Sequence, residues 1–421
     1  MKNRITITEM MAAARELKAQ GEKFTLLGIG PMSMRLIRGV VELAKERDFP
    51  VMLIASRNQV DSDEFGHGYV RGWNQDRFVA DVQSVIDEYG FDGLLYLCRD
   101  HGGPWQRDEE RRAKLPVEEA MDIGVRSYIH DMESGFDLLH IDPTKDPHIN
   151  GVVPLETVLD RTVEIIDRLE KYRKKHGLPH VGFEAGTEET NGGLTSVGAF
   201  GDFVDRLVKA LAEKGLNAPE FVVGQTGTLT RLTENVGSYN TNNARILSRS
   251  AGIHGVGLKE HNGDYLRDSI LLEHPVVDVT AMNVAPEFGV VETRAYLELA
   301  DLESRNVPAG KQSDLRRIMT EAAVRCERWR KWMVGEDASA SVEKMLENSE
   351  KSALIVDITG HYTYEAPEVM DAVAVMTGNL AALGVDADSY VIRKIKDSVD
   401  RYCFCFDMYG LTSKLLKVCG K

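Results

Sequence analysis

The sequence has no apolar run near the ~20 residues that a membrane-spanning helix needs, so we expect no membrane span. Its first residues, Met1-Lys2-Asn3-Arg4, lead into no apolar stretch of the kind found in signal peptides, which predicts a cytoplasmic protein. Only 5 cysteines and 13 prolines occur among 421 residues. These shortages argue against a disulfide scaffold, a cysteine-held metal cluster and a collagen-like chain.

Positive charge is also scarce, because 51 Lys and Arg face 66 Asp and Glu, a net charge of -15. This balance repels nucleic acid and anionic lipid surfaces, and we expect neither as a partner. Two nucleotide-binding signatures are missing as well. The chain has no GxxxxGK[ST] phosphate loop, and Gly28-Ile29-Gly30 lacks the third glycine of the dinucleotide fingerprint, which disfavours a sugar kinase and a Rossmann dehydrogenase.

What the chain does have is a regular alternation of short apolar runs with long amphipathic stretches, which is typical of repeated β–α units. Eight such units favour an α/β protein with a closed (β/α)8 TIM barrel over a doubly wound open sheet. The expected strands are residues 24–29, 51–55, 93–98, 138–141, 181–184, 221–223, 255–258 and 278–282. The expected helices are residues 32–47, 75–89, 117–134, 155–176, 199–214, 240–249, 265–273 and 289–302.

The pattern changes after Pro308, where charged helical stretches follow one another. We therefore assign residues 1–305 to the barrel and residues 306–421 to a mainly helical C-terminal extension packed on it. One further strand-like run is expected at residues 352–360. The extension is either a subdomain of its own or a cap over the barrel.

Active sites of such barrels lie at the C-terminal ends of the strands. Seven consecutive expected strand ends carry charged or amide side chains, which indicates an active site on that face. The side chains concerned are Arg57 and Asn58, Asp100 and His101, His140, Asp142 and Lys145, Glu184 and Glu188, Gln225, Lys259 and His261, and Asn283.

Asp100 and His101, followed by two glycines, are the sharpest local signal, since imidazole suits Zn²⁺ and a neighbouring carboxylate can take up protons. With His261 and Glu184 they complete a two-histidine-plus-carboxylate set that is common for catalytic zinc. A capping Asp and an Asn-Gly turn would explain Asp100 and His261 without any metal. His140 lies deeper in its strand, and we expect it to be a hydrogen-bonded core histidine.

Six motifs, taken in chain order, resemble one known family. They are Arg57-Asn58-Gln59-Val60-Asp61 with Phe65-Gly66 and Gly68-Tyr69, Asp100-His101-Gly102-Gly103-Pro104, Leu139-His140-Ile141-Asp142, Gly186-Thr187-Glu188 with Gly192-Gly193, Glu260-His261-Asn262-Gly263-Asp264-Tyr265, and Val284-Ala285-Pro286 with Thr293-Arg294. The family is the larger, "non-catalytic" subunit of class II D-tagatose-1,6-bisphosphate aldolases, formerly described as tagatose-6-phosphate kinases. The likeness covers nearly the whole chain.

The resemblance implies a TIM barrel related to zinc-dependent class II aldolases and, more distantly, to sugar and uronate epimerases. It implies the following roles: Asp100 as the acid/base carboxylate, His101 and His261 as metal ligands, Glu184 as a carboxylate at the metal and Glu188 as a proton donor on a loop. We add Asp142 to the catalytic set. As substrate-binding residues we expect Arg57, Asn58, Lys145, Gln225, Lys259 and Asn283, of which Gln225 stands where catalytic class II aldolases carry another histidine ligand.

The expected function is retro-aldol chemistry on a ketose or ketose (bis)phosphate, with a divalent metal, expected to be zinc, as Lewis acid. Two alternatives stay open: a ketose or ketouronate epimerase that uses the same metal site, and a non-catalytic subunit that stabilises a partner class II aldolase. The expected partners are thus a sugar or sugar-phosphate substrate and either further copies of this chain or an aldolase subunit.

Overall fold

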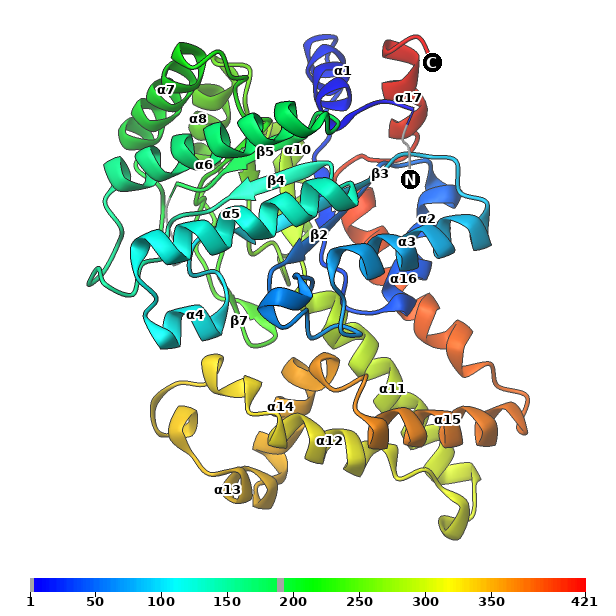
Figure 1. The fold of residues 1–421 in the computed structure, drawn as a ribbon. Coiled ribbons are helices and arrows are strands. Elements are labelled where there is room, and N and C mark those ends of the chain that lie inside the picture. Colours follow the sequence, from blue (N-terminus) through cyan, green and yellow to red (C-terminus); the bar gives the residue numbers. More distant parts are fainter. Residues whose placement is uncertain (1–3, 188–192) are drawn as a thin grey trace.

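A closed barrel of eight parallel strands forms the centre of the molecule, in a computed structural model that describes residues 4–187 and 193–421 (Figure 1). The order around the barrel is β1-β10-β9-β6-β5-β4-β3-β2, so neighbours in the chain are neighbours in the barrel and β1 closes on β10. The strands are β1 (Leu26–Ile29), β2 (Val51–Ser56), β3 (Leu95–Gly102), β4 (Leu138–Ile141), β5 (Gly182–Ala185), β6 (Phe221–Val223), β9 (Gly257–Glu260) and β10 (Ala281–Val284). The predicted (β/α)8 barrel is confirmed.

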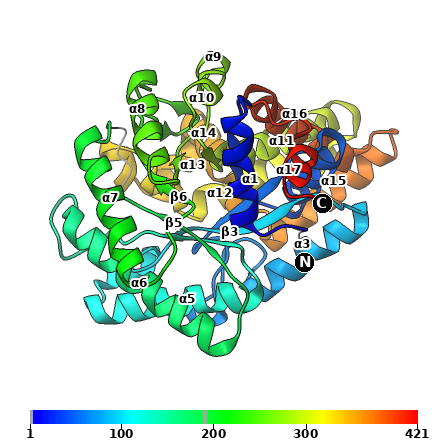
Figure 2. The ribbon, with the colours of Figure 1, turned by 90° about the horizontal axis from the view of Figure 1, so that it is seen from above.

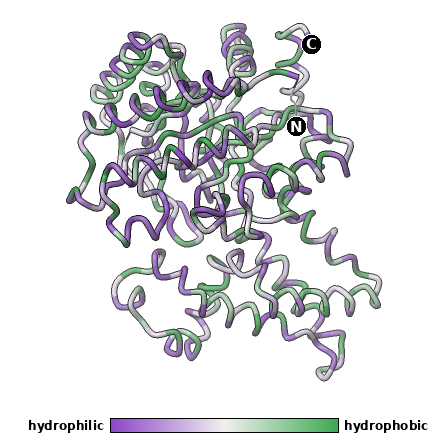
Figure 3. The backbone as a smooth tube through the Cα atoms, viewed as in Figure 1, coloured by the Kyte–Doolittle hydropathy of each residue, from purple (hydrophilic) through white to green (hydrophobic). Residues whose placement is uncertain are grey.

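The strands are apolar because they are enclosed on both faces, by the barrel interior on one side and by helices on the other. Every residue of β1, β4, β5, β6, β9 and β10 is buried. Figure 3 shows purple and green mixed along the outer helices, as expected of helices with one polar and one apolar face. The buried strands also bring their polar C-terminal residues into the interior, where these residues depend on one another for hydrogen bonds.

Helices surround the barrel, and their ends carry the expected capping residues. Ser33 and Asn74 accept backbone hydrogen bonds at the starts of α2 and α3, and α3 ends at Gly90 in a left-handed conformation. The ring consists of α2 (Met34–Arg47), α3 (Gln75–Tyr89), α5 (Val117–Ser134), α6 (Leu155–His176), α7 (Val197–Glu213), α8 (Thr241–Gly252) and α11 (Pro286–Asn306). Short elements lie in the loops: η1 (Asp63–Phe65), α4 (Asp108–Ala113) and the hairpin β7 (Thr230–Arg231) with β8 (Glu234–Asn235).

The helix expected at residues 265–273 is instead two short helices, α9 (Asp268–Leu271) and α10 (Glu273–Val276). Pro275 lacks the N–H that a continuous helix would need there. The C-terminal helix α16 (Ala387–Cys405) packs against α2, α11 and α9, so the end of the chain completes the ring. Helix α1 (Ile7–Ala19), which the sequence analysis did not anticipate, crosses the end of the barrel away from the lobe, beside α17 (Leu411–Val418) (Figure 2).

Residues 309–381 form a helical C-terminal lobe, reached through the long helix α11 (Figure 1). Its elements are η2 (Ala309–Lys311), α12 (Leu315–Arg325), η3 (Arg328–Lys331), η4 (Gly335–Ser339), α13 (Val342–Glu347), α14 (Ser349–Thr359), η5 (Gly360–Tyr362) and α15 (Pro367–Ala381). The strand expected at 352–360 is wrong, because Asn348 caps a helix there whose buried residues Ser352, Ile355, Val356 and Thr359 share one face. Among the described residues every helix is too short or too polar to span a bilayer.

Candidate active site

A pocket of about 290 Å³ opens between the C-terminal ends of the strands and the C-terminal lobe. The barrel supplies its floor and walls, and the lobe supplies its roof. The lining residues from the barrel are Met32, Ile54, Ser56, Asn58, Gln59, Tyr69, Asp100, His101, Lys145, His261, Asn262, Asp264, Asn283, Ala285 and Pro286, and those from the lobe are Arg328, Lys331, Trp332 and Tyr362. The face predicted from the polar strand ends is thus the one that holds this pocket.

Four potential metal ligands meet at the floor of this pocket. Asp100, His101, His140 and His261 each offer one ligand atom, and these atoms all lie within 4.8 Å of one another. A single Oδ1 atom of Asp100 lies 3.9 Å from His101 Nε2, 3.9 Å from His140 Nδ1 and 4.0 Å from His261 Nε2. Three imidazoles therefore surround one carboxylate, and we call these four residues the His–Asp cluster.

A bulge in β3 lets two consecutive residues contribute to the cluster. In a regular strand Asp100 and His101 would point to opposite faces of the sheet. The register between β3 and β4 shifts between Arg99 and Gly102, and His101 adopts a φ of 44°, in the left-handed region. The bulge therefore brings the side chains of Asp100 and His101 to the same face of β3, as β-bulges near active sites commonly do.

Two further carboxylates fix the ring orientations of the histidines. His101 Nδ1 donates to Asp142 Oδ2 at 2.5 Å, and His261 Nε2 donates to Glu184 Oε1 at 3.0 Å. The other nitrogens, His101 Nε2 and His261 Nδ1, then face each other at 3.0 Å. Two lone pairs at this distance repel unless a cation lies between them, so the donor set fits a proton or a divalent metal ion, in the carboxylate–histidine–metal arrangement.

His140 contributes to the cluster instead of being a satisfied core histidine. Its Nδ1 accepts the backbone N–H of His101 at 3.2 Å and faces the carboxylate of Asp100. Its Nε2 is buried without a hydrogen-bond partner among the described residues. The sequence did carry a signal for this residue, since His140 and Asp142 lie two apart and so share one face of β4.

Glu184, expected at the metal, is already occupied by other groups. Lys259 Nζ donates to Glu184 Oε2 at 2.6 Å, both side chains are buried, and Oε1 receives His261. An ammonium bound this closely neutralises the carboxylate, which makes Glu184 a holder of His261 more than a ligand. Lys259, expected to bind an anionic substrate, lies beneath the cluster and outside the pocket lining.

Asn283, at the end of β10, connects the pocket wall to the cluster. Its Nδ2 donates to Asp100 Oδ1 at 3.0 Å. This contact requires glycine at position 28, because a Cβ there would lie 2.2 Å from Asn283 Oδ1. The glycine that resembled a fragment of a dinucleotide motif therefore makes room for an active-site amide.

Electrostatics keeps the cluster in a definite charge state. Burial raises the pKa of Asp100, but the three imidazoles outweigh it and hold the pKa below its ordinary value. Burial lowers the pKa of His261 to about 4, so its imidazole is neutral near pH 7. Burial also lowers the pKa of His101, but Asp100 and Asp142 outweigh it and raise the pKa overall.

The remaining predicted site residues lie in three kinds of position. Asn58 and Lys145 line the pocket. Arg57 is fully buried in ion pairs with Asp61 at 2.9 Å and Glu110 at 2.8 Å, which makes it a structural cation of the β2 loop. Gln225 is buried and does not line the described pocket; its backbone carbonyl accepts the N–H of Thr195, and its own N–H donates to Thr195 Oγ1. Glu188 falls outside the described residues.

The chain matches the model of the family described as "D-tagatose-1,6-bisphosphate aldolase subunit GatZ/KbaZ-like" over residues 11–388 and belongs to this family. The resemblance drawn from the six motifs is thereby confirmed.

Solved structures with a similar fold include a probable tagatose 6 phosphate kinase from Sinorhizobium meliloti 1021, with a TM-score of 0.76 and 20% identity over 90% of this chain and 100% of that chain. The fructuronate-tagaturonate epimerase UxaE from Cohnella laeviribosi has a TM-score of 0.57 and 13% identity over 92% of this chain and 82% of that chain. A fructose-bisphosphate aldolase from Campylobacter jejuni has a TM-score of 0.55 and 13% identity over 96% of each chain. At these identities the likeness shows the fold, and the chemistry has to be argued from the residues.

Proposed function

We propose that this protein is a metal-dependent carbohydrate enzyme that performs retro-aldol chemistry on a ketose or ketose (bis)phosphate. The observation that carries the proposal is the His–Asp cluster, in which carboxylate-held imidazoles converge at the floor of a pocket on the catalytic face of a TIM barrel. Among the described residues His140 Nε2 is buried without a hydrogen-bond partner, and His101 Nε2 and His261 Nδ1 have a hydrogen-bond contact only with each other, which leaves these nitrogens available to a metal ion.

The three histidines are the proposed metal ligands, with His140 in place of the expected Glu184. When bound, a divalent ion, for which zinc is the expected metal, supplies a Lewis acid that polarises a carbonyl oxygen. Asp142 and Glu184 hold the rings of His101 and His261 in the required tautomers. Asn283 holds the Asp100 carboxylate at the edge of the pocket.

Asp100 is the proposed proton acceptor. Its ionised oxygen takes the proton of the C4 hydroxyl as the C3–C4 bond breaks and the aldehyde forms. The electron pair of that bond stays on the C3 fragment, to which a proton is then returned. Glu188, by its resemblance to the family's loop carboxylate, is the proposed donor of that proton. Asn58 and Lys145 lie in the pocket where they can hold hydroxyl and anionic groups of the substrate.

Epimerisation at C4 is the second candidate, and the roof of the pocket favours it. Trp332 and Tyr362 cover the site from the lobe, so an aldehyde formed by C3–C4 cleavage is retained within about 290 Å³. A retained aldehyde can rotate and recombine on its other face, with Asp100 returning its proton. The same residues thus serve both reactions, and product release decides between them.

The test measures metal content and turnover on the same samples. Elemental analysis of the metal-loaded chain is expected to show one ion per molecule, lost in His101→Ala and in His261→Ala. His254→Ala is the matched control, since His254 precedes β9 at its opposite end, and it is expected to keep the ion. Metal retained in both cluster variants would contradict the site.

Turnover is screened with ketoses, ketose bisphosphates and ketouronates, and cleavage products distinguish an aldolase from an epimerase. A chain that binds metal and converts none of them, yet raises the melting temperature of a partner class II aldolase, would be the non-catalytic subunit.

A further inference from the structure

Two cationic side chains of the C-terminal lobe form part of the pocket roof. Arg328 and Lys331 are the first and last residues of η3, and both line the pocket that holds Asp100, His101 and His261 at its floor. The lobe therefore contributes charged side chains to the pocket in addition to covering it.

Aromatic rings hold these two cations in place. The Arg328 guanidinium lies 4.9 Å from the ring centre of Tyr69 and 4.8 Å from that of Tyr362, so it is flanked by one ring from the barrel and one from the lobe. Lys331 Nζ lies 5.2 Å from the ring of Trp332 and 5.5 Å from that of Tyr362. A cation that packs against the face of an aromatic ring is held in position by the ring. Its N–H groups remain available to donate hydrogen bonds to a ligand.

Within residues 4–187 and 193–421, no carboxylate pairs with Arg328 or Lys331, and neither side chain donates a hydrogen bond to a protein acceptor. Their neighbour Arg330 shows the contrasting arrangement, because it pairs with Glu327 at 2.8 Å. Of the two acids that line the pocket, Asp100 belongs to the cluster, and Asp264 accepts backbone N–H groups of Ala285 and Glu287. Arg328 and Lys331 are thus held by aromatic rings and not by carboxylates, at a place where both line the pocket of the His–Asp cluster.

Three acids, Asp108, Glu109 and Glu327, line a neighbouring pocket together with Arg328 and Lys331, but among the described residues none of them forms an ion pair with either cation. Burial, together with the charges of Lys331 and Arg328, lowers the pKa of His361 to about 3, so this histidine stays neutral. Lys145, from the loop after β4, extends the cationic lining on the barrel side. Three cationic side chains, those of Lys145, Arg328 and Lys331, therefore line the pocket.

We infer that Arg328 and Lys331 form an oxyanion subsite that binds the phosphoryl or carboxylate group of the substrate remote from the reacting carbons. The inference rests on the proposed function for the identity of the reacting end, and it narrows the substrate to an anionic ketose. Arg328 presents the planar fork that suits both oxyanions, and Lys331 supplies a point charge beside it. Because η3 belongs to the lobe, an anionic substrate would connect the lobe to the barrel when it binds.

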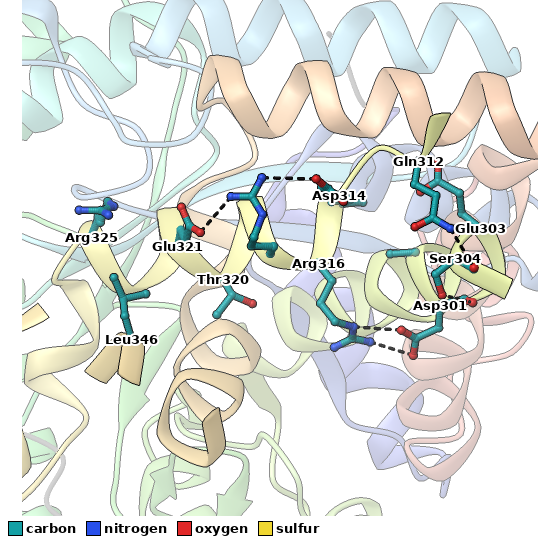
Figure 4. Close-up of a pocket in the computed structure, with 13 residues that line it drawn as sticks. Asp301, Glu303, Ser304, Gln312, Asp314, Arg316, Thr320, Glu321, Arg325 and Leu346 are labelled. Atoms are coloured by element: carbon teal, nitrogen blue, oxygen red, sulfur yellow. Dashed lines mark hydrogen bonds and ion pairs between the residues drawn. The ribbon is translucent and has the colours of Figure 1, made fainter. Parts of the chain in front are cut away.

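Calorimetric titration tests the subsite without requiring turnover. The probes are inorganic phosphate, D-glucuronate and the neutral ketose D-fructose, and the proteins are the full chain and its variants Arg328→Gln and Lys331→Gln. Arg325→Gln is the matched control, because Arg325 also lies in the lobe and carries the same charge but lines a different pocket (Figure 4). The larger response between phosphate and glucuronate identifies which oxyanion the subsite prefers.

Each substitution in the subsite is expected to weaken binding of the preferred anion about tenfold or more, since a hydrogen bond to a charged group is lost. Binding of D-fructose and the affinity of Arg325→Gln for the anion are expected to stay as in the unmodified chain. Unchanged anion affinity in both subsite variants, or no binding of either anion by the unmodified chain, overturns the inference. Lys331 is exposed, so Lys331→Gln carries the test even where Arg328→Gln fails to fold.

Metal content measured on the same samples separates this inference from the proposed function. Anion binding that depends on Arg328 and Lys331 supports the subsite even in a chain that holds no metal. If the chain binds metal and is active, but its anion affinity is the same in Arg328→Gln and Lys331→Gln, the proposed function stands and the subsite is refuted.

Discussion

Two of the pockets lined by charged side chains organise their charges in opposite ways. In the pocket of about 570 Å³ between α11 and α12, most of the charged side chains pair with one another (Figure 4). Its Arg316 pairs with Asp301 at 2.9 Å, and its Arg317 pairs with Glu321 at 3.0 Å and Asp314 at 3.5 Å. The smaller pocket at the barrel instead directs imidazoles, a carboxylate and stacked cations toward one shared space.

The difference teaches that the density of charge does not identify a site. Exposed ion pairs satisfy one another and are worth little energetically. Polar groups that face one space without fully pairing with each other can still bind a ligand there. Leaving them incompletely paired lowers the stability of the fold, and the rest of the structure has to offset that loss. The predictions below test this contrast, beginning with the largest expected effect.

Asp100→Asn is expected to lower turnover by ~10²–10⁴, because the amide keeps the shape of the side chain and removes its proton-accepting charge. The melting temperature should fall as well, because the imidazoles that hold the pKa of Asp100 low favour its ionised form in the folded protein, so kinetics are measured well below the melting temperature of the variant. Steady-state kinetics on the substrate found in the screen provide the measurement. Asp314→Asn in the other pocket is the control and should retain full activity. An Asp100→Asn enzyme with unchanged kcat would remove Asp100 from the chemistry.

Lys259→Met is expected to lower the free energy of unfolding by about 3–5 kcal/mol, because it leaves the buried Glu184 carboxylate without its cation. Urea denaturation measures the change. The double variant Lys259→Met with Glu184→Gln should recover part of the loss, since the uncompensated charge is then gone. A loss below about 1 kcal/mol in the single variant would show that the pair behaves like a surface ion pair.

Glu292 tests α11, the helix that contributes residues to both pockets. Burial raises the pKa of Glu292 from 4.5 to about 7, so the folded protein holds this proton more tightly than the unfolded chain does. The stabilisation from this group is complete below pH 4.5 and is lost as the pH rises to about 7.

Glu292→Gln should therefore match the unmodified chain at pH 4.5 and exceed its unfolding free energy at pH 8 by about 2 kcal/mol. Urea unfolding at the two pH values is the measurement. Glu298→Gln on the same helix is the control, because burial raises the pKa of Glu298 but Tyr390 and Lys394 outweigh it and lower the pKa overall. Equal stability gains at both pH values would speak against a titrating Glu292.

Arg316→Gln has the smallest expected effect. Both partners of the Arg316–Asp301 pair are more than 40% exposed, so solvent screens their attraction. The unfolding free energy should fall by less than about 1 kcal/mol, and turnover should not change. A large loss of either quantity would show that the second pocket has a role that its self-paired charges do not reveal.

Much of the fold could be predicted from the sequence because the barrel strands are short, apolar and separated by amphipathic helices. That spacing is enough to place Asp100, His101 and His261 on one face of the barrel. The strand expected at 352–360 was a wrong prediction, because there the local pattern and the tertiary packing disagree. Its apolar, β-branched residues suit a strand locally, but packing inside the lobe selects the helix α14.

The site was harder to predict where its geometry depends on contacts distant in sequence. Arg57 and Lys259 looked like substrate-binding cations, and only the fold shows that each is enclosed by its own carboxylates. Arg328 and Lys331 looked like ordinary charges of a C-terminal helix. The alternation of cations with Trp329 and Trp332 was a signal for them, but it does not tell which face of the lobe meets the barrel.

By itself the sequence determined the β–α alternation, the polar strand ends and the family motifs, because hydrophobic periodicity and local residue chemistry act over a few neighbouring positions. Only the tertiary structure decided which of those polar groups meet. The bulge at His101 turns two consecutive side chains to one side, and Gly28 admits Asn283. Helix α11 carries the lobe across the barrel so that Arg328 lines one pocket with Asp100 and His101, more than 200 residues away along the chain. Such proximity depends on packing between elements far apart in the chain, and no local pattern encodes it.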